Sequence, residues 1–167
     1  MEDGSMNSLM PIVGTAAVLG TAIVGGVFFA FSSFIMKALG RVSAPEGIAA
    51  MQSINVVVIN PSFLGAFMGT ALLSVGVIVM ALLNSGHPSA MFFLGGAVCY
   101  FAGTFLVTMF GNVPLNDQLA SVSPSDPAAA KLWMHYLDRW TMWNTVRTIA
   151  TIAATVLFTV GLIQDGG

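Results

Sequence analysis

The chain alternates four long apolar stretches with short connections that carry most of its polar residues. The apolar stretches cover about residues 10–37, 61–83, 90–111 and 139–163. Each reaches the ~20 residues that a helix needs to cross the hydrocarbon core of a bilayer. The pattern therefore predicts an all-α integral membrane protein, a four-helix bundle that occupies residues 10–164 as a single four-span domain.

The first connection and the amino-terminal residues depart from this apolar pattern. Residues 1–9 are expected to lie outside the domain, as a tag or a disordered terminus, because their acidic start is unlike the basic start of a signal peptide. The connection after the first span contains Ala44-Pro45-Glu46, which is typical of a helix start. We therefore expect this connection to be partly helical.

The last span belongs to a longer run with no glycine or proline between Pro127 and Gly161. Ser125 or Asp126 is expected to cap this helix, with Pro127 at its first position. A helix over residues 126–163 would be ~55 Å long at ~1.5 Å per residue, well beyond the ~30 Å of bilayer hydrocarbon. The sequence thus predicts an extended last helix that projects, bends or divides.

Polar side chains share one face of this last helix. At ~100° per residue, that face holds Trp140, Asn144, Arg147, Thr148, Thr151 and Thr155. A guanidinium inside a membrane span costs on the order of a few kcal/mol, unless it faces a bundle interior or a polar cavity. Arg147 is therefore expected either to reach back to the interface and fix the position of the helix, or to line a ligand site with Asn144.

Two further polar groups occur at the ends of spans. Asn60 is expected either to point inward at membrane depth, where its amide needs partners, or to cap the helix that begins at Pro61. After the third span, Pro114 is expected to prevent simple continuation of the helix. Amides and a carboxylate gather around this proline, and they favour either a hydrated helix cap or half of a site; they are Asn112, Asn116, Asp117 and Gln118.

The composition supports a membrane protein and excludes some partners. Of the 167 residues, 56% are hydrophobic and only 7% are charged, against about 25% charged in typical soluble proteins. The net charge of −2 gives no basic field for nucleic acid. The lone cysteine, Cys99, cannot form an internal disulfide and is expected to be a buried structural thiol. We expect the lipid bilayer to be the main partner.

The positions of the basic residues predict an orientation. Lys37, Arg41, Lys131 and Arg139 belong to the two long connections or their boundary, whereas the short turn after Asn84 has no lysine or arginine. The positive-inside rule then places the long connections in the cytoplasm and both termini outside the cytoplasm, in the cell (inner) membrane. Small residues recur at four-residue spacing in the first two spans, which favours close helix packing and a homo-oligomer.

Three short motifs carry a resemblance to a known family. They are Asn60-Pro61 at the entrance of the second span, Val113-Pro114-Leu115-Asn116 after the third, and Trp143-Asn144-x-x-Arg147-Thr148 in the fourth. Together with the four spans, they make the chain resemble the small anthrone oxygenase-like membrane proteins from Gly14 to Leu162. The resemblance implies an oxygenase for an anthrone-like or other polycyclic phenolic compound, working without metal or flavin.

The residues of such a site can be assigned roles from their chemistry. Oxygenation through an enolate needs a base, a stabiliser of the oxyanion and an apolar slot. Arg147 and Asn144 could stabilise the enolate. His135 or Asp138 could be the base, although His135 projects opposite Asn144 on a straight helix. The residues that we expect to bind the substrate are Asn60, Pro114, Asn116, Trp140 and Trp143.

A second class of function uses the same residues without a base. A non-catalytic membrane module could bind a lipid or quinone through the Trp, Asn and Arg face, or could serve as an assembly partner. In both cases the ligand is a small hydrophobic or aromatic molecule. No histidine pair at helical spacing on the spans supports a haem, and we expect no metal site.

Overall fold

The computed structural model describes residues 3–166, with side chains from Leu9 onward. Every element in this range is helical, which confirms the all-α prediction, and π-helical segments are labelled η. The elements are α1 (Asp3–Ala30), η1 (Phe31–Ile35), α2 (Met36–Leu39), α3 (Ala44–Val57), α4 (Pro61–Leu83), α5 (Ala90–Tyr100), η2 (Phe101–Leu106), η3 (Thr108–Asn112), α6 (Val113–Ala120) and α7 (Ala129–Asp165).

Four continuous helical runs in these residues are long and apolar enough to cross a membrane. They are Leu9–Leu39, Pro61–Leu83, Ala90–Ala120 and Ala129–Asp165. The four-span prediction is confirmed, and the chain is a multi-pass membrane protein whose helices contact the bilayer. The first, third and fourth runs are longer than the apolar stretches alone suggested.

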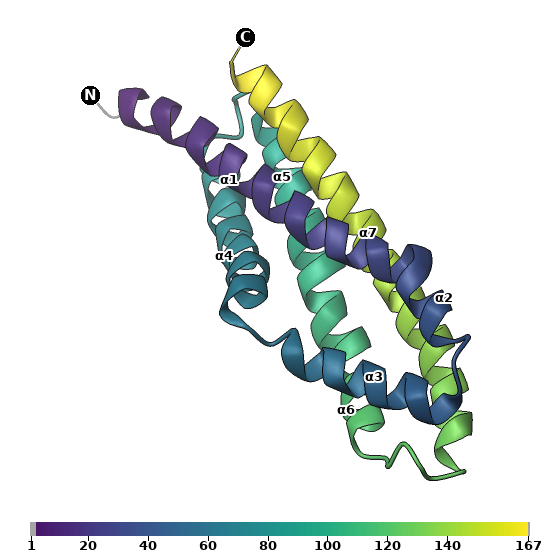
Figure 1. Ribbon diagram of the computed structural model, residues 1–167. Coiled ribbons are helices and arrows are strands. Elements are labelled where there is room, and N and C mark those ends of the chain that lie inside the picture. The colour runs from purple at the N-terminus through teal and green to yellow at the C-terminus, as the bar shows by residue number, and fades with distance from the viewer. Residues whose placement is uncertain (1–2, 167) are drawn as a thin grey trace.

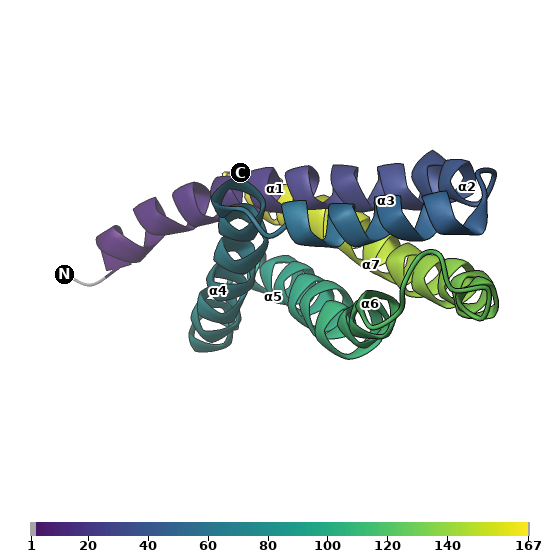
Figure 2. The same cartoon turned by 60° about the horizontal axis from the view of Figure 1, so that its bottom comes forward.

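The bundle is organised around α7, which has α1 and α5 along its sides. α4 packs on α5 and α1 instead, and Figure 2 shows it leaning away from α7. α1 begins and α7 ends at the same end of the bundle, whereas α3 crosses the opposite end beside α6 (Figure 1). The partly helical first connection is confirmed as α3, and this helix closes one end of the bundle.

The third span runs through Pro114, but not as a simple continuation of the α-helix. The two π-helical segments η2 and η3 precede it, and the Val113 N–H donates to the Thr108 carbonyl five residues earlier. Proline lacks an N–H, and its ring clashes with the carbonyl four residues earlier in an α-helix. The wider π turn accommodates this change, so the chain passes into α6 with Pro114 in its first turn.

The last helix begins two residues later than expected. α7 starts at Ala129, and Asp126 Oδ1 accepts a hydrogen bond from the Ala128 N–H (2.8 Å) in the turn before it. From Ala129 the helix runs without interruption for 37 residues. The prediction of an extended last helix is confirmed, and the helix does not divide near Arg139.

Two apolar clusters hold these helices together. One fills the bundle between α1, α4, α5 and α7, with Val24, Phe93 and Phe158 completely buried and Cys99 partly buried against them. The other lies at the α3 end and joins α3, α6 and the first half of α7, with buried side chains that include Ile48, Met51, Leu119, Trp133 and Tyr136. Because Ile48 and Met51 are completely buried, α3 is anchored by packing on the bundle.

The start of α3 is fixed by a local pair of hydrogen bonds. The Ser43 N–H and hydroxyl both donate to Glu46 Oε2, at 3.1 and 2.6 Å. These bonds favour the ionised carboxylate and hold the pKa of Glu46 below its usual value. Ala44-Pro45-Glu46 therefore begins a helix, as the sequence predicts.

Small residues divide into those that permit helix contact and those that face outward. A Cβ at Gly20 would overlap the hydroxyl of Thr70 on α4, so this glycine allows α1 and α4 to approach closely. By contrast, a Cβ at Gly26, Gly65 or Gly69 would meet no atom within 4 Å. The two glycines of the Gly65–Gly69 pattern therefore face away from the other described helices.

We predict opposite effects for alanine at two glycines of α1. Gly20→Ala should lower the free energy of unfolding by about 1–3 kcal/mol, because the added methyl group overpacks the contact with Thr70. Gly26→Ala should leave stability unchanged or raise it by up to about 1 kcal/mol through helix propensity. Thermal unfolding of both variants in one detergent checks this, and equal midpoints would contradict the α1–α4 contact.

We also predict that the first turn of α3 loosens in acid. Because the pKa of Glu46 is lowered in the folded state, its stabilising effect is complete above the usual carboxyl pKa and is lost as the pH falls through the lowered value. Amide hydrogen exchange in the first turn should therefore accelerate between neutral pH and about pH 3, after correction for intrinsic rates. Glu46→Gln should lack this pH dependence, and an identical response in both proteins would exclude Glu46 as its cause.

Candidate functional site

A cavity of about 280 Å³ lies at the α3 end of the bundle. This volume is near the lower end of the range for small-molecule sites, roughly 300 Å³. The lining is mostly apolar. It comprises Val27, Phe28 and Phe31 from α1 and η1, Met51, Ile54, Asn55, Val58 and Ile59 from α3 and the following turn, Phe63, Leu64, Phe67 and Met68 from α4, Thr108, Met109, Val113 and Asn116 from η3 and α6, and Trp140 and Arg147 from α7.

Arg147 forms the charged part of this wall, with only 4% of its surface exposed. Its Nη1 donates to Thr108 Oγ1 (3.1 Å), and its Nη2 donates to Asn144 Oδ1 (2.7 Å). The guanidinium carbon lies 4.1 Å from the centre of the Phe28 ring and 5.2 Å from that of Trp140. Neutral oxygens and aromatic faces thus surround the cation, and the two rings each contribute on the order of 1 kcal/mol.

No carboxylate neutralises Arg147 among the described residues. Within 4 Å, the basic and acidic side chains that meet among these residues are those of His87 and Asp165, near the end of α7. Arg147 Nε also has no hydrogen-bond partner in the described part of the chain. A buried cation is normally paired, because removing it from water costs several kcal/mol. The cavity therefore offers an uncompensated positive charge and spare N–H groups, an arrangement suited to an oxyanion.

Asn144 holds Arg147 in place. Its Nδ2 donates to the Phe28 carbonyl and to Ser32 Oγ, both at 2.7 Å, while its Oδ1 accepts from Arg147. Both amide hydrogens are therefore occupied, and Asn144 does not line the cavity. Its amide joins α7 to the junction of α1 and η1, so it orients the guanidinium and leaves no donor for a ligand.

Asn116 has a different arrangement, because its oxygen is occupied and its nitrogen is not. Asn116 Oδ1 accepts from the Tyr136 hydroxyl (2.8 Å) and from Trp140 Nε1 (2.9 Å). Its Nδ2 has no hydrogen-bond partner among the described residues, and the side chain lines the cavity. Two donors on the oxygen fix the amide plane, so the NH₂ group is the part of Asn116 that remains for a ligand.

The third span supplies the polar contacts behind Arg147. Thr104 and Thr151 bond through their hydroxyls (2.8 Å), and Thr108 accepts from Arg147. Asn112 Nδ2 donates to the Trp140 carbonyl (3.1 Å), while its buried Oδ1 has no partner in the described part of the chain. These bonds lie in or beside η2 and η3, so the π-helical segments are the part of the third span that meets the polar face of α7.

Three of the five residues expected to bind the substrate lie outside the cavity lining. Asn60 caps α4, since its Oδ1 accepts from the Phe63 N–H (3.0 Å) and its Nδ2 donates to the Val57 carbonyl (2.9 Å). Pro114 is exposed in the first turn of α6. Trp143 is half-buried, with its ring against Gly111. The structure brings Asn116, Trp140 and Arg147 together at the cavity, but not these three.

The two candidate bases also lie away from the cavity. His135 and Asp138 are both exposed on α7, and neither lines the cavity. Their positions follow from the helical period, because Tyr136, Trp140 and Asn144 occupy the inward face of the same helix. Among the residues that the structure describes, no carboxylate or imidazole lines the cavity.

Sequence reasoning missed Asn55, Thr108 and Phe28. Asn55 lies four residues after the buried Met51, so the helical period of α3 places both on its inner face. That period was the available signal for Asn55. Thr108 lies four residues after Thr104, but its partner on α7 depends on the π turns between them. Phe28 has no sequence signal that separates it from the other aromatic residues of the spans.

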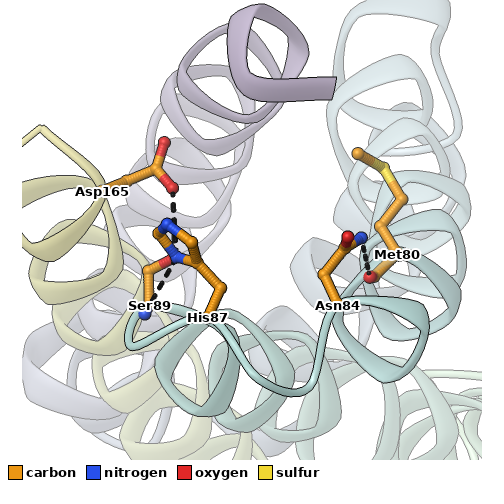
Figure 3. Close-up of polar contacts among 5 residues, drawn as sticks. All are labelled: Met80, Asn84, His87, Ser89 and Asp165. Atoms are coloured by element: carbon orange, nitrogen blue, oxygen red, sulfur yellow. Dashed lines mark hydrogen bonds and ion pairs between the residues drawn. The ribbon is translucent and has the colours of Figure 1, made fainter. Parts of the chain in front are cut away.

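A second polar cluster lies at the opposite end of the bundle (Figure 3). His87 Nδ1 is 2.8 Å from Ser89 Oγ, which donates to Asp165 Oδ1 (3.1 Å). Nearby, Asn84 Nδ2 donates to the Met80 carbonyl (2.8 Å). The bonds of His87 and Ser89 attach the α4–α5 turn to the end of α7. The His87 side chain is 44% exposed, and no group of three metal-binding side chains occurs within the described residues.

The fold and cavity define a class of protein: a membrane-embedded helical bundle with a buried cation, unpaired among the described residues, at an apolar cavity. The sequence model of the anthrone oxygenase family matches residues 59–157, more than half of the chain. This chain belongs to the anthrone oxygenase family. Comparison with curated proteins and with solved structures finds no match. The matched segment contains Thr108, Asn116 and Arg147, whereas Phe28 and Asn55 precede it.

We predict that Asn144→Ala destabilises the bundle much more than a control on the same helix. The change leaves the Phe28 carbonyl and the guanidinium without their partner, so a loss of about 2–4 kcal/mol is expected. In the control Thr159→Ala, the exposed hydroxyl loses only its bond to the Thr155 carbonyl, and the change should stay within about 0.5 kcal/mol. Thermal unfolding in detergent checks this. Equal losses of stability in the two variants would show that Asn144 does not hold Arg147 in place.

Proposed function

We propose that this protein is a membrane-embedded oxygenase that acts on an anthrone-like or other polycyclic phenolic compound. The observation that carries the proposal is the buried guanidinium of Arg147, which borders an apolar cavity without a carboxylate partner among the described residues. Membership of the anthrone oxygenase family supports the class of reaction. The aromatic wall formed by Phe28, Phe63 and Trp140 supports a flat, apolar ligand.

The proposed chemistry starts from the enolate of the ligand. Loss of a proton from the ring CH₂ leaves negative charge on the oxygen, and Arg147 stabilises this oxyanion relative to the neutral ketone. The enolate transfers electrons to dioxygen, and a C–O bond forms at the ring carbon. The resulting peroxide regains a proton and loses water, which leaves the carbonyl of a quinone. Each ligand therefore consumes one O₂ and releases one water.

The residues have distinct roles in this proposal. Arg147 binds the oxyanion, and the free NH₂ group of Asn116 supplies a second donor. Trp140 and Phe28 flank the rings of the ligand, while Asn144 orients Arg147 without touching the ligand. The cavity works without a resident cofactor, because the ligand itself is the electron donor to dioxygen.

His135 does not enter this proposal, because its imidazole is exposed outside the cavity. With no carboxylate or imidazole in the lining, the ligand is taken up in its ionised form, and its proton passes to water at the membrane surface. Arg147 favours that form by its charge. A base on the chain is then unnecessary, and the pH dependence of turnover follows the ionisation of the substrate.

The same lack of a base in the lining favours a second candidate function, a non-catalytic module that binds a quinone or the head group of a lipid. A quinone oxygen would accept hydrogen bonds from Arg147 and Asn116 as an enolate does, but no oxygen would be consumed. Oxygen uptake therefore separates the enzyme from the binding module.

The proposal also includes the orientation and assembly of the chain. Residues 10–164 form one four-span domain in the cell membrane, with both termini outside the cytoplasm. Lys37, Arg41 and Lys131 lie at or near the α3 end, which supports a cytoplasmic position for this end. The outward glycines Gly65 and Gly69 support assembly into a homo-oligomer.

We predict that Arg147→Ala lowers kcat/KM for oxygen uptake with an anthrone by about 10²–10³-fold, because it removes the charge that stabilises the enolate. Arg147→Lys should retain part of the activity, since it keeps the charge without the planar pair of donors. The measurement uses purified protein in detergent or nanodiscs, with circular dichroism and gel filtration to verify folding.

Two control variants on α7 sharpen this test. Arg139→Ala removes an exposed arginine, whose one side-chain hydrogen bond among the described residues is to Met142 Sδ. His135→Asn removes the exposed imidazole. Both should oxidise the substrate at the wild-type rate. Full activity in folded Arg147→Ala would overturn the proposed role of Arg147, and loss of activity in His135→Asn would restore the imidazole as a base.

A further inference from the structure

The most exposed part of the Arg147 cavity is apolar, whereas the guanidinium is buried. The four most exposed side chains of the lining are all apolar: Ile59 (68%), Leu64 (37%), Met68 (42%) and Met109 (43%). We call these four residues the mouth. Arg147, at 4% exposure, lies in the interior. A ligand that enters through the mouth thus passes hydrocarbon side chains before it reaches the guanidinium.

The mouth lies between α4 and the third span, where these two helices separate. α4 packs along α5 and η2, but its contacts thin out before η3. Figure 1 shows the lower end of α4 diverging from the third span toward its connection with α3. The divergence leaves Leu64 and Met68 on one side of the opening and Met109 on the other. It is a lateral gap between two spans.

Two of the mouth residues, Leu64 and Met68, lie on α4 within the membrane span. α4 is a span that begins at Pro61, and Leu64 and Met68 lie about 5 and 10 Å into it at ~1.5 Å per residue. An apolar opening at this depth faces the boundary between lipid head groups and acyl chains. Water would leave these side chains without favourable partners, whereas lipid or an apolar ligand would pack against them.

We infer that the cavity is filled laterally from the bilayer, through the mouth between α4 and η3, by a lipophilic ligand that enters with its oxygen first. The identity of the ligand as a polycyclic phenol rests on the proposed function, but the route does not. The four mouth residues select for compounds that partition into the membrane, and Arg147 then selects those with an oxyanion or a carbonyl at the leading edge.

The route can be tested without turnover by labelling a thiol placed inside the cavity. Val27 lines the cavity from α1 and is close in size to cysteine, so Val27→Cys in a Cys99→Ala background provides the reporter. Pyrenyl maleimide, which dissolves in lipid, and a charged, water-soluble methanethiosulfonate are added to the protein in lipid vesicles. Lateral entry predicts labelling by the pyrenyl reagent and negligible labelling by the charged reagent.

Bulky substitutions on α4 supply the matched comparison. In the reporter background, Leu64→Trp should slow pyrenyl labelling by roughly an order of magnitude, because the larger side chain narrows the opening. Leu72 lies on the exposed face of α4, outside the cavity lining, so Leu72→Trp should leave the labelling rate unchanged. Met68→Trp is a second variant of the mouth, and it keeps the test decisive if Leu64→Trp does not fold.

Each result either supports the route or overturns it. Faster labelling by the charged reagent than by the pyrenyl reagent would show that the cavity opens to water. An unchanged pyrenyl rate in folded Leu64→Trp and Met68→Trp would show that the ligand does not pass between α4 and η3. If labelling follows the expected pattern but no anthrone is oxidised, the lateral route stands and the oxygenase proposal fails.

Discussion

The guanidinium of Arg147 is buried among neutral groups inside a membrane bundle, and its contacts join three of the four spans. Such a charge costs on the order of a few kcal/mol at membrane depth, unless the surrounding residues solvate it. Here Thr108, Asn144 and the faces of two aromatic rings provide that solvation. Because these groups come from α1, the third span and α7, three of the four spans must be in place before the cation is accommodated.

Two departures from regular helix geometry make this arrangement fit. In the third span, η2 and η3 rotate the polar side chains relative to a continuous α-helix and carry the chain past Pro114. In the first span, η1 begins beside the Phe28 carbonyl, which accepts from Asn144. α3 then closes the end of the bundle through Ile48 and Met51. The cavity exists because α4 diverges from the third span while α3 bridges the gap between them.

The segment matched by the family model includes most of the polar residues of the cavity. The match to the anthrone oxygenase family covers Asn116, Trp140 and Arg147, which surround the polar part of the cavity. Phe28 and Asn55 complete the wall from outside the matched segment. Because the two candidate bases on α7 are exposed, the proposed reaction depends on the ionisation of the ligand and not on a base in the chain.

Local hydrophobic pattern and helical period were enough to predict the four spans, the helical first connection, the extended last helix and the inward face that holds Asn144 and Arg147. They left open whether Asn60 caps a helix or points inward, and they gave no sign of Thr108 or Phe28. Only the packed bundle shows which polar groups contact one another. The π turns rotate the side chains of the third span, and α3 is positioned by packing against residues far away in the sequence. Side-chain partners on different helices depend on that relative rotation, which no local pattern encodes.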